Sequence, residues 1–231
     1  MRLFKGNFVR RIFYFNVDNV VILRYRELKV EGWQAMTRIG DWMQTFTGRQ
    51  FWPLDPRPED IVIEDIAHAL SLQCRYGGHV RTFYSVAEHS WRVSKVCNEE
   101  DALWGLMHDA AEAYLVDLPR PIKRYSALGD EYRRIESRLM SVICDRFSLS
   151  RVEPLDVKRS DDFMLHWEGR DLMGPHPVPW VREGDFSLPE GCLIPMSPRV
   201  AEAAFLERFA ELISVTGLEK SWRHSGYAAG R

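Results

Sequence analysis

Residues 104–123 read WGLMHDAAEAYLVDLPRPIK, a helical spacing of apolar residues with the polar pair His108 and Asp109 inside it. The apolar pattern starts earlier, so we expect a helix over residues 101–114 that ends before Pro119. The apolar neighbours would place the polar pair near the core, where an unpaired carboxylate is very costly. A metal ion would neutralise it. Hydrogen bonds inside a helical bundle are an equal alternative for this segment alone.

The flanking segments predict further helices. Ser85 precedes an apolar-periodic run and Glu88 follows it by three residues, which is the capping-box arrangement that starts a helix. Ser197 followed by Pro198 is a favoured cap and first helical residue. Helical spacing also predicts helices at residues 61–72, 130–147, 155–173 and 197–215. Because hardly any segment after residue 35 alternates with period two, the sequence predicts an all-α helical bundle.

Two proline-rich stretches interrupt the helical pattern. Residues 46–58, FTGRQFWPLDPRP, contain three prolines and a glycine, so we expect an ordered, aromatic-rich loop without regular structure. Residues 174–195 contain five prolines, which is typical of a functional loop or a surface wrap.

Residues 1–35 differ in composition from the rest of the chain. They mix aromatic and β-branched residues with seven Lys or Arg against three acids, which predicts one or two strands or an appendage. A basic arm for nucleic acid is the alternative, but the segment lacks helical or repeat patterning. Since Met36 opens a more conventional beginning, we expect an N-terminal extension over residues 1–35, one domain over 36–220 and a fraying tail over 221–231.

The overall composition excludes several classes of function. Hydrophobic residues make up 45% and charged residues 28% of the 231 positions, as in ordinary globular proteins. With 31 basic and 33 acidic residues the net charge is -2, so no general cationic field attracts nucleic acid or anionic lipid. The longest aliphatic run, residues 20–23, is far shorter than the ~20 apolar residues that cross a bilayer. We therefore expect a cytoplasmic protein without nucleic-acid or membrane partners.

Further residues of ligand type fall on other predicted helices. His89 lies one turn into the capped helix, and Asp161 lies near the start of the helix over residues 155–173. Either residue alone is more often structural or solvated. Together with His108 and Asp109 they form a set of two imidazoles and two carboxylates, which suits Mn, Fe, Co, Ni or Zn rather than Ca or a thiolate site.

The order of these residues resembles the HD-domain metal-dependent phosphohydrolase superfamily, which has a histidine, a His-Asp pair and a distant aspartate on different helices. SVAEHS supplies His89 and VKRSD supplies Asp161. HDAAEAYLVDLPRPIK supplies His108 and Asp109, and this block is especially similar to the bacterial 5'-deoxynucleotidases. The segment TFTGRQFWPLDPRPEDI is similar to the openings of phage and prophage HD hydrolases. The resemblance covers residues 42–175.

The resemblance implies an HD-type helical bundle that holds one divalent transition metal ion, Co, Mn, Zn, Fe or Ni. Its ligands would be His89, His108, Asp109 and Asp161, with coordination positions left for water and a phosphate oxygen. Such an ion lowers the pKa of its water and polarises the phosphoryl group, so that hydroxide attacks near neutral pH.

Two carboxylates follow the His-Asp pair at the spacing found in the 5'-deoxynucleotidases, Glu112 and Asp117. The resemblance implies that they serve the attacking water and the leaving sugar oxygen as acid and base, without binding the metal. Spacing does not assign the two roles. The structural alternative is that Glu112 is a carboxylate on a helix face and that Asp117 caps amides in a turn.

Four residues are candidates for substrate contact. Arg75 lies 14 residues before His89, at the place of the nucleotidases' substrate-binding arginine, where its fork of donors suits a phosphate. Tyr76 replaces a tryptophan thought to exclude the ribose 2'-hydroxyl, so the resemblance does not imply a preference for deoxyribose. Arg81 and Lys123 are further candidates for phosphate contact, with ordinary solvated residues near turns as the alternative.

The sequence therefore predicts a metal-dependent phosphohydrolase that releases phosphate from (deoxy)nucleoside 5'-monophosphates. One alternative is a (deoxy)nucleoside triphosphate triphosphohydrolase of the same fold, which a basic cluster beyond the metal would favour. The other is a non-catalytic HD-fold module that binds a nucleotide or a partner protein. The expected partner is a small-molecule nucleotide. Related enzymes often form dimers or larger assemblies, which leaves a homodimer or a higher homo-oligomer open.

Overall fold

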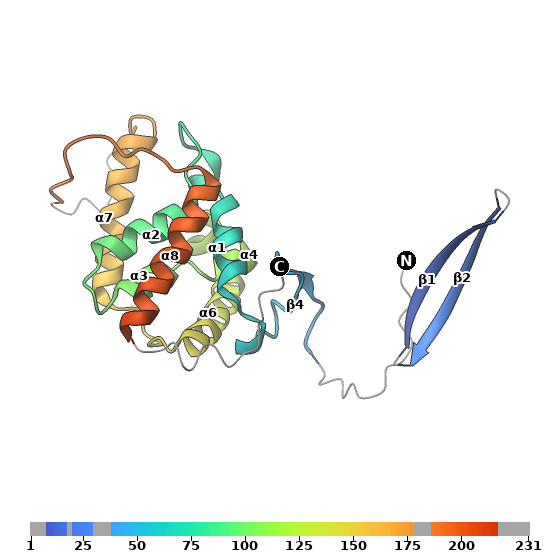
Figure 1. Ribbon diagram of the computed structural model, residues 1–231. Helices are drawn as coiled ribbons and strands as arrows, with labels where there is room; N and C mark the ends of the chain where they lie inside the picture. The colour runs from blue at the N-terminus through green and yellow to red at the C-terminus, as the bar shows by residue number, and fades with distance from the viewer. Residues whose placement is uncertain (1–7, 18–19, 30–37, 178–185, 217–231) are drawn as a thin grey trace. The chain divides into compact units, whose positions relative to one another are not determined.

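The computed structural model describes residues 8–17, 20–29, 38–177 and 186–216 (Figure 1). The chain divides into two compact units, Met1–Arg38 and Ile39–Arg231. The predicted tail over residues 221–231 lies outside the described residues, as do Met36 and part of the proline-rich stretch, residues 178–185.

The first unit contains an antiparallel pair of strands, β1 (Phe8–Val17) and β2 (Val20–Lys29). Their register runs from Phe8 opposite Lys29 to Val17 opposite Val20. Aromatic and β-branched residues suit a pleated strand, and they are frequent in both segments. The strands expected in the N-terminal segment are thus confirmed.

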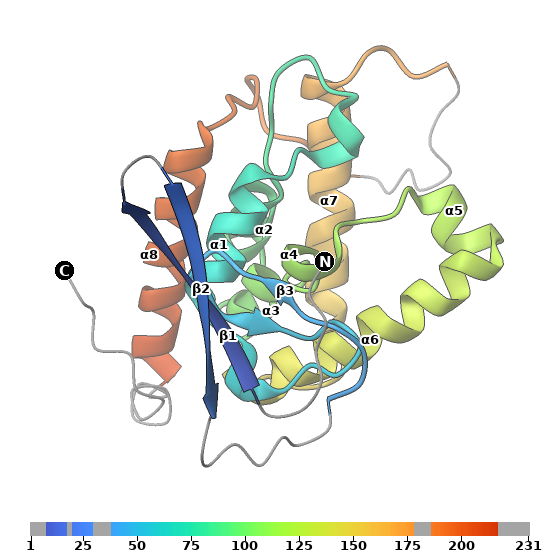
Figure 2. The same cartoon turned by 90° about the vertical axis from the view of Figure 1, so that its right-hand side faces the viewer.

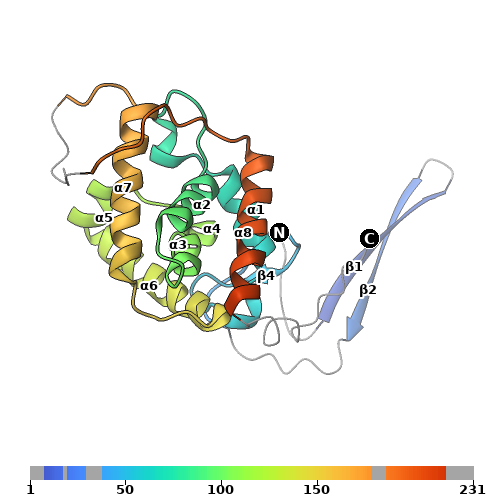
Figure 3. The same cartoon turned by 60° about the vertical axis from the view of Figure 1, so that its left-hand side comes forward.

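The second unit is a bundle of helices, which confirms the all-α prediction. In chain order its helices are α1 (Ile63–Leu72), α2 (Val86–Val96), α3 (Ala102–Met107), α4 (Glu112–Leu115), α5 (Arg120–Tyr125), α6 (Ala127–Phe147), α7 (Leu155–Leu172) and α8 (Pro198–Thr216). Both α2 and α3 contact α7 and α8, and they lie between them in Figure 3. Figure 2 shows α5 and the adjoining part of α6 on the far side of α7 from α8. None of the helices in the described part of the chain has the length and apolar character needed to cross a membrane.

Two helix boundaries differ from the prediction. The helix expected over residues 101–114 is divided into α3 and α4 by a turn. The helix expected from residue 130 begins earlier, because the Ser126 hydroxyl accepts a hydrogen bond from the Gly129 N–H and caps α6. The short helix α5 was not expected. It carries Pro121 in its first turn, where a missing N–H costs no helical hydrogen bond.

The predicted loop over residues 46–58 contains part of a short strand pair, β3 (Met43–Gln44) and β4 (Gln50–Phe51). The segment is ordered, because the Thr47 N–H and hydroxyl donate to the Asp65 carboxylate at 2.7 and 3.0 Å. Phe51 is fully buried and stacks on Tyr114. The prediction that regular structure is absent is wrong at β4, since all three prolines follow that strand.

Two groups of buried apolar side chains hold the bundle together. The larger one joins α1, α3, α6 and α8 through fully buried residues that include Ile66, Leu70, Leu106, Leu139 and Phe205. The second one joins α2, α3 and α7 through residues that include Val93, Trp104, Val157 and Met164. The core therefore fixes α2, α3 and α7 relative to one another, and these are the elements that carry or adjoin the predicted metal ligands.

Gly105 allows the close approach of α3 to α2. A Cβ at this position would lie 2.7 Å from Cys97 Sγ and 3.4 Å from the Ser94 Cα. Gly105→Ala should therefore destabilise the fold by about 1–3 kcal/mol, as overpacking typically does. Chemical denaturation followed by circular dichroism measures this change. Gly174→Ala is the control, because a Cβ there meets nothing within 4 Å. Equal stability of the two variants would contradict the prediction.

All predicted site residues lie in the second unit, so residues 1–35 should be dispensable for its folding. A chain that starts at Met36 should keep the helical circular dichroism and the cooperative thermal unfolding of the full chain, because it retains all the helices of the second unit and the buried apolar side chains that join them. Loss of the helical signal would show that the segment contributes to the core after all.

Candidate metal centre

His89 lies on α2 and is fully buried. The helix begins where expected, because the Ser85 hydroxyl accepts a hydrogen bond of 3.0 Å from the Glu88 N–H. The second hydrogen bond of the predicted capping box, from the Ser85 N–H to the Glu88 carboxylate, is replaced by other partners. The Glu88 carboxylate instead accepts from Arg92 at 2.8 and 2.9 Å and from the Met196 N–H at 2.7 Å. A charge-assisted pair with Arg92 is stronger than a bond to the neutral Ser85 amide.

His108 and Asp109 follow the last residue of α3, in a turn rather than in a continuous helix. The N–H groups of residues 112–114 donate to carbonyl oxygens three residues back instead of four. This tightening is the reason why the helix expected over residues 101–114 divides here. His108 stays tied to α3 through its Nδ1, which lies 2.8 Å from the Gly105 carbonyl oxygen.

The structure brings the predicted ligands together. The ligand atoms of His89, His108 and Asp161 all lie within 4.8 Å of one another. His89 Nε2 is 3.2 Å from His108 Nε2 and 3.2 Å from an Asp161 carboxylate oxygen. Asp109 adjoins them, with Oδ2 3.2 Å from His108 Nε2 and 3.8 Å from His89 Nε2. Ligands bonded at about 2.1 Å to one ion stand about 3.0–3.4 Å apart, so these separations suit a common ion. We call these four residues the metal cluster.

The hydrogen bonds of the two imidazoles determine which nitrogen of each ring faces the other ligands. His108 Nδ1 faces the Gly105 carbonyl, and His89 Nδ1 faces the Glu168 carboxylate at 2.6 Å. Both partners accept hydrogen bonds, so each Nδ1 carries a proton, and in the neutral ring each Nε2 directs its lone pair inward. Two lone pairs and two carboxylates that face one another repel unless a cation lies between them. The donor set therefore fits a divalent metal ion.

The pKa values of the metal-cluster residues show that the two carboxylates favour a positive charge beside them. Burial alone would lower the pKa of His108, but the Asp109 and Asp161 carboxylates raise it to about 10. Burial would raise the pKa of Asp161, but the hydrogen bond and charge of His89 hold it well below its ordinary value. The pKa of Asp109 is lowered in the same way, against burial, by His108. Both carboxylates therefore stay ionised.

Glu168 is a residue of this site that the sequence analysis missed. It lies on α7, seven residues after Asp161, and its side chain is fully buried. Its carboxylate accepts hydrogen bonds from four side chains: His89 Nδ1 (2.6 Å), Tyr84 Oη (2.9 Å), Tyr76 Oη (2.8 Å) and Arg75 Nε (3.1 Å). Burial would raise its pKa, but Arg75 and His89 lower it to about 2. The seven-residue spacing, which places Glu168 on the helix face of Asp161, is the signal that could have found it.

Arg75 and Tyr76 lie beside the metal cluster, in the tight turn Arg75–Gly78. Arg75 Nη1 is 3.3 Å from the Asp109 carboxylate, so the predicted phosphate-binding arginine contacts a predicted metal ligand. Tyr76 has a φ of 57°, which non-glycine residues rarely adopt. Its hydroxyl is held by Glu168. The turn thus presents a cation and an aromatic ring next to the metal cluster.

The two candidate acid-base carboxylates lie near the two ends of α4. Glu112 is its buried first residue, and Asp117 comes two residues after its end. Burial raises the pKa of Glu112 well above its ordinary value, and the charges of Asp109 and Asp117 add to this effect. Burial also raises the pKa of Asp117, although Lys123 opposes it. Both groups therefore hold a proton to higher pH than an isolated carboxyl does.

Val116 connects α4 to Asp117 through a strained backbone. Its φ of 59° and ψ of 148° are a conformation that a β-branched residue rarely adopts. Two hydrogen bonds hold it there: its N–H donates to the Glu112 carbonyl at 2.9 Å, and its carbonyl accepts from the Tyr132 hydroxyl. The direction in which Asp117 leaves α4 is therefore fixed from both sides.

The other candidates for phosphate contact have different surroundings. Lys123 Nζ lies 2.7 Å from Glu136 and 3.4 Å from Asp117, so it pairs with two carboxylates. Arg81 is exposed, and its backbone N–H donates to the Leu172 carbonyl. No hydrogen bond between the Arg81 side chain and the metal cluster is found among the described residues. Its part in substrate binding stays a prediction.

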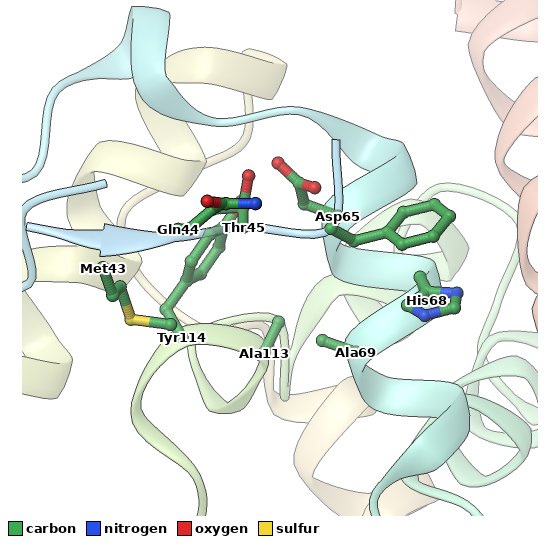
Figure 4. A pocket seen from close by; sticks show the side chains of 9 residues that line it. Met43, Gln44, Thr45, Asp65, His68, Ala69, Ala113 and Tyr114 are labelled. Atoms are coloured by element: carbon green, nitrogen blue, oxygen red, sulfur yellow. The ribbon is translucent and has the colours of Figure 1, made fainter. Parts of the chain in front are cut away.

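A cavity of about 320 Å³ lies next to β3 (Figure 4). Its lining consists of Met43, Gln44, Thr45, Phe46, Asp65, His68, Ala69, Ala113 and Tyr114. None of the predicted site residues is among them. Two of its polar groups are already engaged, since Asp65 accepts from Thr47 and His68 stacks on Phe46 at 3.6 Å between ring centroids. In the part of the chain that the structure describes, this cavity is therefore separate from the residues of the metal cluster.

Fold and cluster together define a helical-bundle protein with a candidate metal centre of two histidines and carboxylates. Uncharacterized protein YfdR of Escherichia coli is 40% identical over 171 residues, which cover 74% of this chain and 94% of that protein. The chain therefore belongs to the YfdR family.

Two more distant relatives match smaller parts of the chain. An uncharacterized protein of Rhodobacter capsulatus is 38% identical over 128 residues, 52% of this chain and 64% of that protein. A 5'-deoxynucleotidase of Photobacterium profundum is 28% identical over 123 residues, 50% of this chain and 60% of that enzyme. No family model matches the chain.

Proposed function

We propose that the chain is a metal-dependent phosphohydrolase of the HD superfamily that releases phosphate from nucleoside 5'-monophosphates, deoxynucleotides included. The observation that carries this proposal is the convergence of His89, His108 and Asp161 from separate elements, with Nε2 of both imidazoles directed to one point and Nδ1 of each held by an acceptor behind the ring. The relative that is a 5'-deoxynucleotidase supports the class of reaction.

The residues present would hold one divalent transition metal ion. His89, His108, Asp109 and Asp161 are its proposed ligands. When bound, such an ion supplies Lewis-acid activation of water and of the phosphoryl group. Arg75 places a fixed positive charge beside these ligands, and its planar fork of donors suits phosphate oxygens.

The proton transfers are assigned to Glu112 and Asp117. One activates the water, and the other protonates the sugar oxygen that leaves, which balances the protons of the hydrolysis. Their raised pKa values are in the direction that the acid donor of this pair requires. The bonds of Val116 to both neighbouring elements keep Asp117 in a defined position.

The charges around the metal cluster favour a monophosphate over a triphosphate. Arg75 is shared between Asp109 and Glu168, and Lys123 is shared between Asp117 and Glu136. Each of these cations is thus already balanced by two carboxylates. A triphosphate chain would need additional positive charge beyond the metal.

A phosphate-release screen tests the proposed activity. The purified chain is incubated with Mn²⁺ or Co²⁺ and with ribo- and deoxyribonucleoside 5'-mono- and 5'-triphosphates. We expect inorganic phosphate from monophosphates, abolished by a chelator, and no inorganic triphosphate from triphosphates. Release of triphosphate would replace the proposed substrate class, and no release from any nucleotide would refute the activity.

The metal site predicts how ligand variants behave. The purified chain should bind about one transition metal ion, and His108→Ala or Asp161→Ala should lose most of it, because each removes one donor atom from the metal cluster. Elemental analysis after dialysis measures the metal content. His68→Ala is the control, since His68 pairs with Glu202 on α8. Equal metal content in all three variants and the parental chain would show that the ligands are wrongly assigned.

The acid-base assignment predicts a loss of rate without a loss of metal. Glu112→Gln and Asp117→Asn keep shape and hydrogen bonding but remove proton transfer, so kcat should fall by roughly 10²- to 10⁴-fold with a much smaller change in KM. Steady-state kinetics together with metal content measure this. The control is Asp130→Asn, which changes an exposed carboxylate on α6. If both site variants only lower the melting temperature and keep turnover per folded molecule, the carboxylates are structural supports.

A further inference from the structure

We propose that Glu168 is a positioning residue that holds the metal ligand His89 and the phosphate-binding arginine Arg75 in one fixed arrangement. This inference rests on the proposed metal site and goes beyond it. It assigns a role to a buried residue that touches neither the expected ion nor the expected substrate.

Both oxygens of the Glu168 carboxylate are fully engaged. One oxygen faces His89 Nδ1 and the Tyr84 hydroxyl, and the other accepts from Arg75 Nε and the Tyr76 hydroxyl. An ionised carboxylate offers about four acceptor positions, so these four donors use its whole capacity. Because Glu168 is fully buried, water does not replace a donor that is lost.

The first oxygen determines the tautomer of His89. With Nδ1–H donated to Glu168 at 2.6 Å, Nε2 is the nitrogen left to bind an ion, and it lies 3.2 Å from both His108 Nε2 and an Asp161 carboxylate oxygen. The opposite tautomer would point a proton into the metal cluster and exclude the ion. A carboxylate behind a metal-binding imidazole also raises the basicity of the ring.

The second oxygen determines where Arg75 lies. Its Nε donates to Glu168 at 3.1 Å, and Nη1 of the same planar group then reaches the Asp109 carboxylate at 3.3 Å. The guanidinium is rigid, so fixing Nε also fixes the direction of its other donors. One buried carboxylate thus sets the position of a metal ligand and of an anion-binding group together.

A glutamine cannot replace Glu168 in this arrangement. Its amide has one oxygen and one NH₂ group, whereas both Arg75 Nε and His89 Nδ1–H must donate. If the amide oxygen faces Arg75, the NH₂ group faces His89 and favours the wrong tautomer. If the oxygen faces His89, the NH₂ group opposes the arginine.

Titration of the metal-free full-length chain with Co²⁺ tests this role. Glu168→Gln should raise the dissociation constant for Co²⁺ by roughly 10- to 100-fold, the usual effect of losing a partner behind a metal ligand. Inorganic phosphate should also bind the metal-loaded variant more weakly than the metal-loaded parental chain. The matched control is Glu88→Gln, which changes another fully buried glutamate that is paired with an arginine. It should lower stability but keep near-parental Co²⁺ affinity.

The outcomes separate this inference from the proposed function. Parental Co²⁺ affinity in Glu168→Gln, or an equal loss in Glu88→Gln, overturns the positioning role. If Glu168→Gln does not fold, Glu168→Asp decides: it keeps the charge but is too short to reach both His89 and Arg75, so parental Co²⁺ affinity in that variant overturns the role. A parental chain that binds Co²⁺ but hydrolyses no nucleotide refutes the activity and leaves this inference standing. A parental chain that binds no Co²⁺ refutes both.

Discussion

The site depends on one electrostatic constraint, the meeting of several electron-pair donors at a single point. His89 Nε2 and His108 Nε2 lie 3.2 Å apart, and the carboxylates of Asp109 and Asp161 adjoin them. In a poorly solvated interior such groups repel strongly, while a cation among them turns the repulsion into attraction. Both rings present Nε2 because Gly105 and Glu168 take up the Nδ1 protons. The hydrogen bonds behind the rings are therefore as important as the ligands themselves.

The packing of α2, α3 and α7 against one another brings these donor groups together. Gly105 lets α3 lie close to α2, and the tight turn after α3 places Asp109 next to both histidines. Buried side chains such as Val157 and Met164 fix α7, so that Asp161 and, two turns later, Glu168 face α2. Three of the four candidate ligands are thus held by packed helices or by the turn directly attached to one, which would suit a site that keeps its geometry when an ion binds.

In the proposed function, the charge balance around the metal cluster would connect metal binding to phosphate binding. Arg75 lies between Asp109 and Glu168, and an ion bound by Asp109 would weaken the attraction of that carboxylate for the guanidinium. Arg75 Nη1 would then be available to a phosphate oxygen, while Nε stays anchored on Glu168. Lys123 balances Asp117 in a similar way through its second partner, Glu136. Under the proposed function, a bound metal ion would therefore favour binding of the substrate phosphate.

The sequence by itself determined the helical class of the fold and the start of α2 at Ser85, because periodicity and caps are properties of short segments. The four candidate ligands followed from the resemblance of its motifs to the HD superfamily. The sequence did not determine the turn that divides α3 from α4, since that change needs the packed bundle around His108. Nor did it determine the partners of Glu88. Its carboxylate accepts a hydrogen bond from the N–H of Met196, 108 positions away, instead of from an amide at the start of its own helix. Only the tertiary structure placed Glu168 against His89, 79 residues earlier in the chain. The physical reason is that burial and hydrogen-bond partners are set by which helices pack together, and no local pattern encodes the contacts between distant segments.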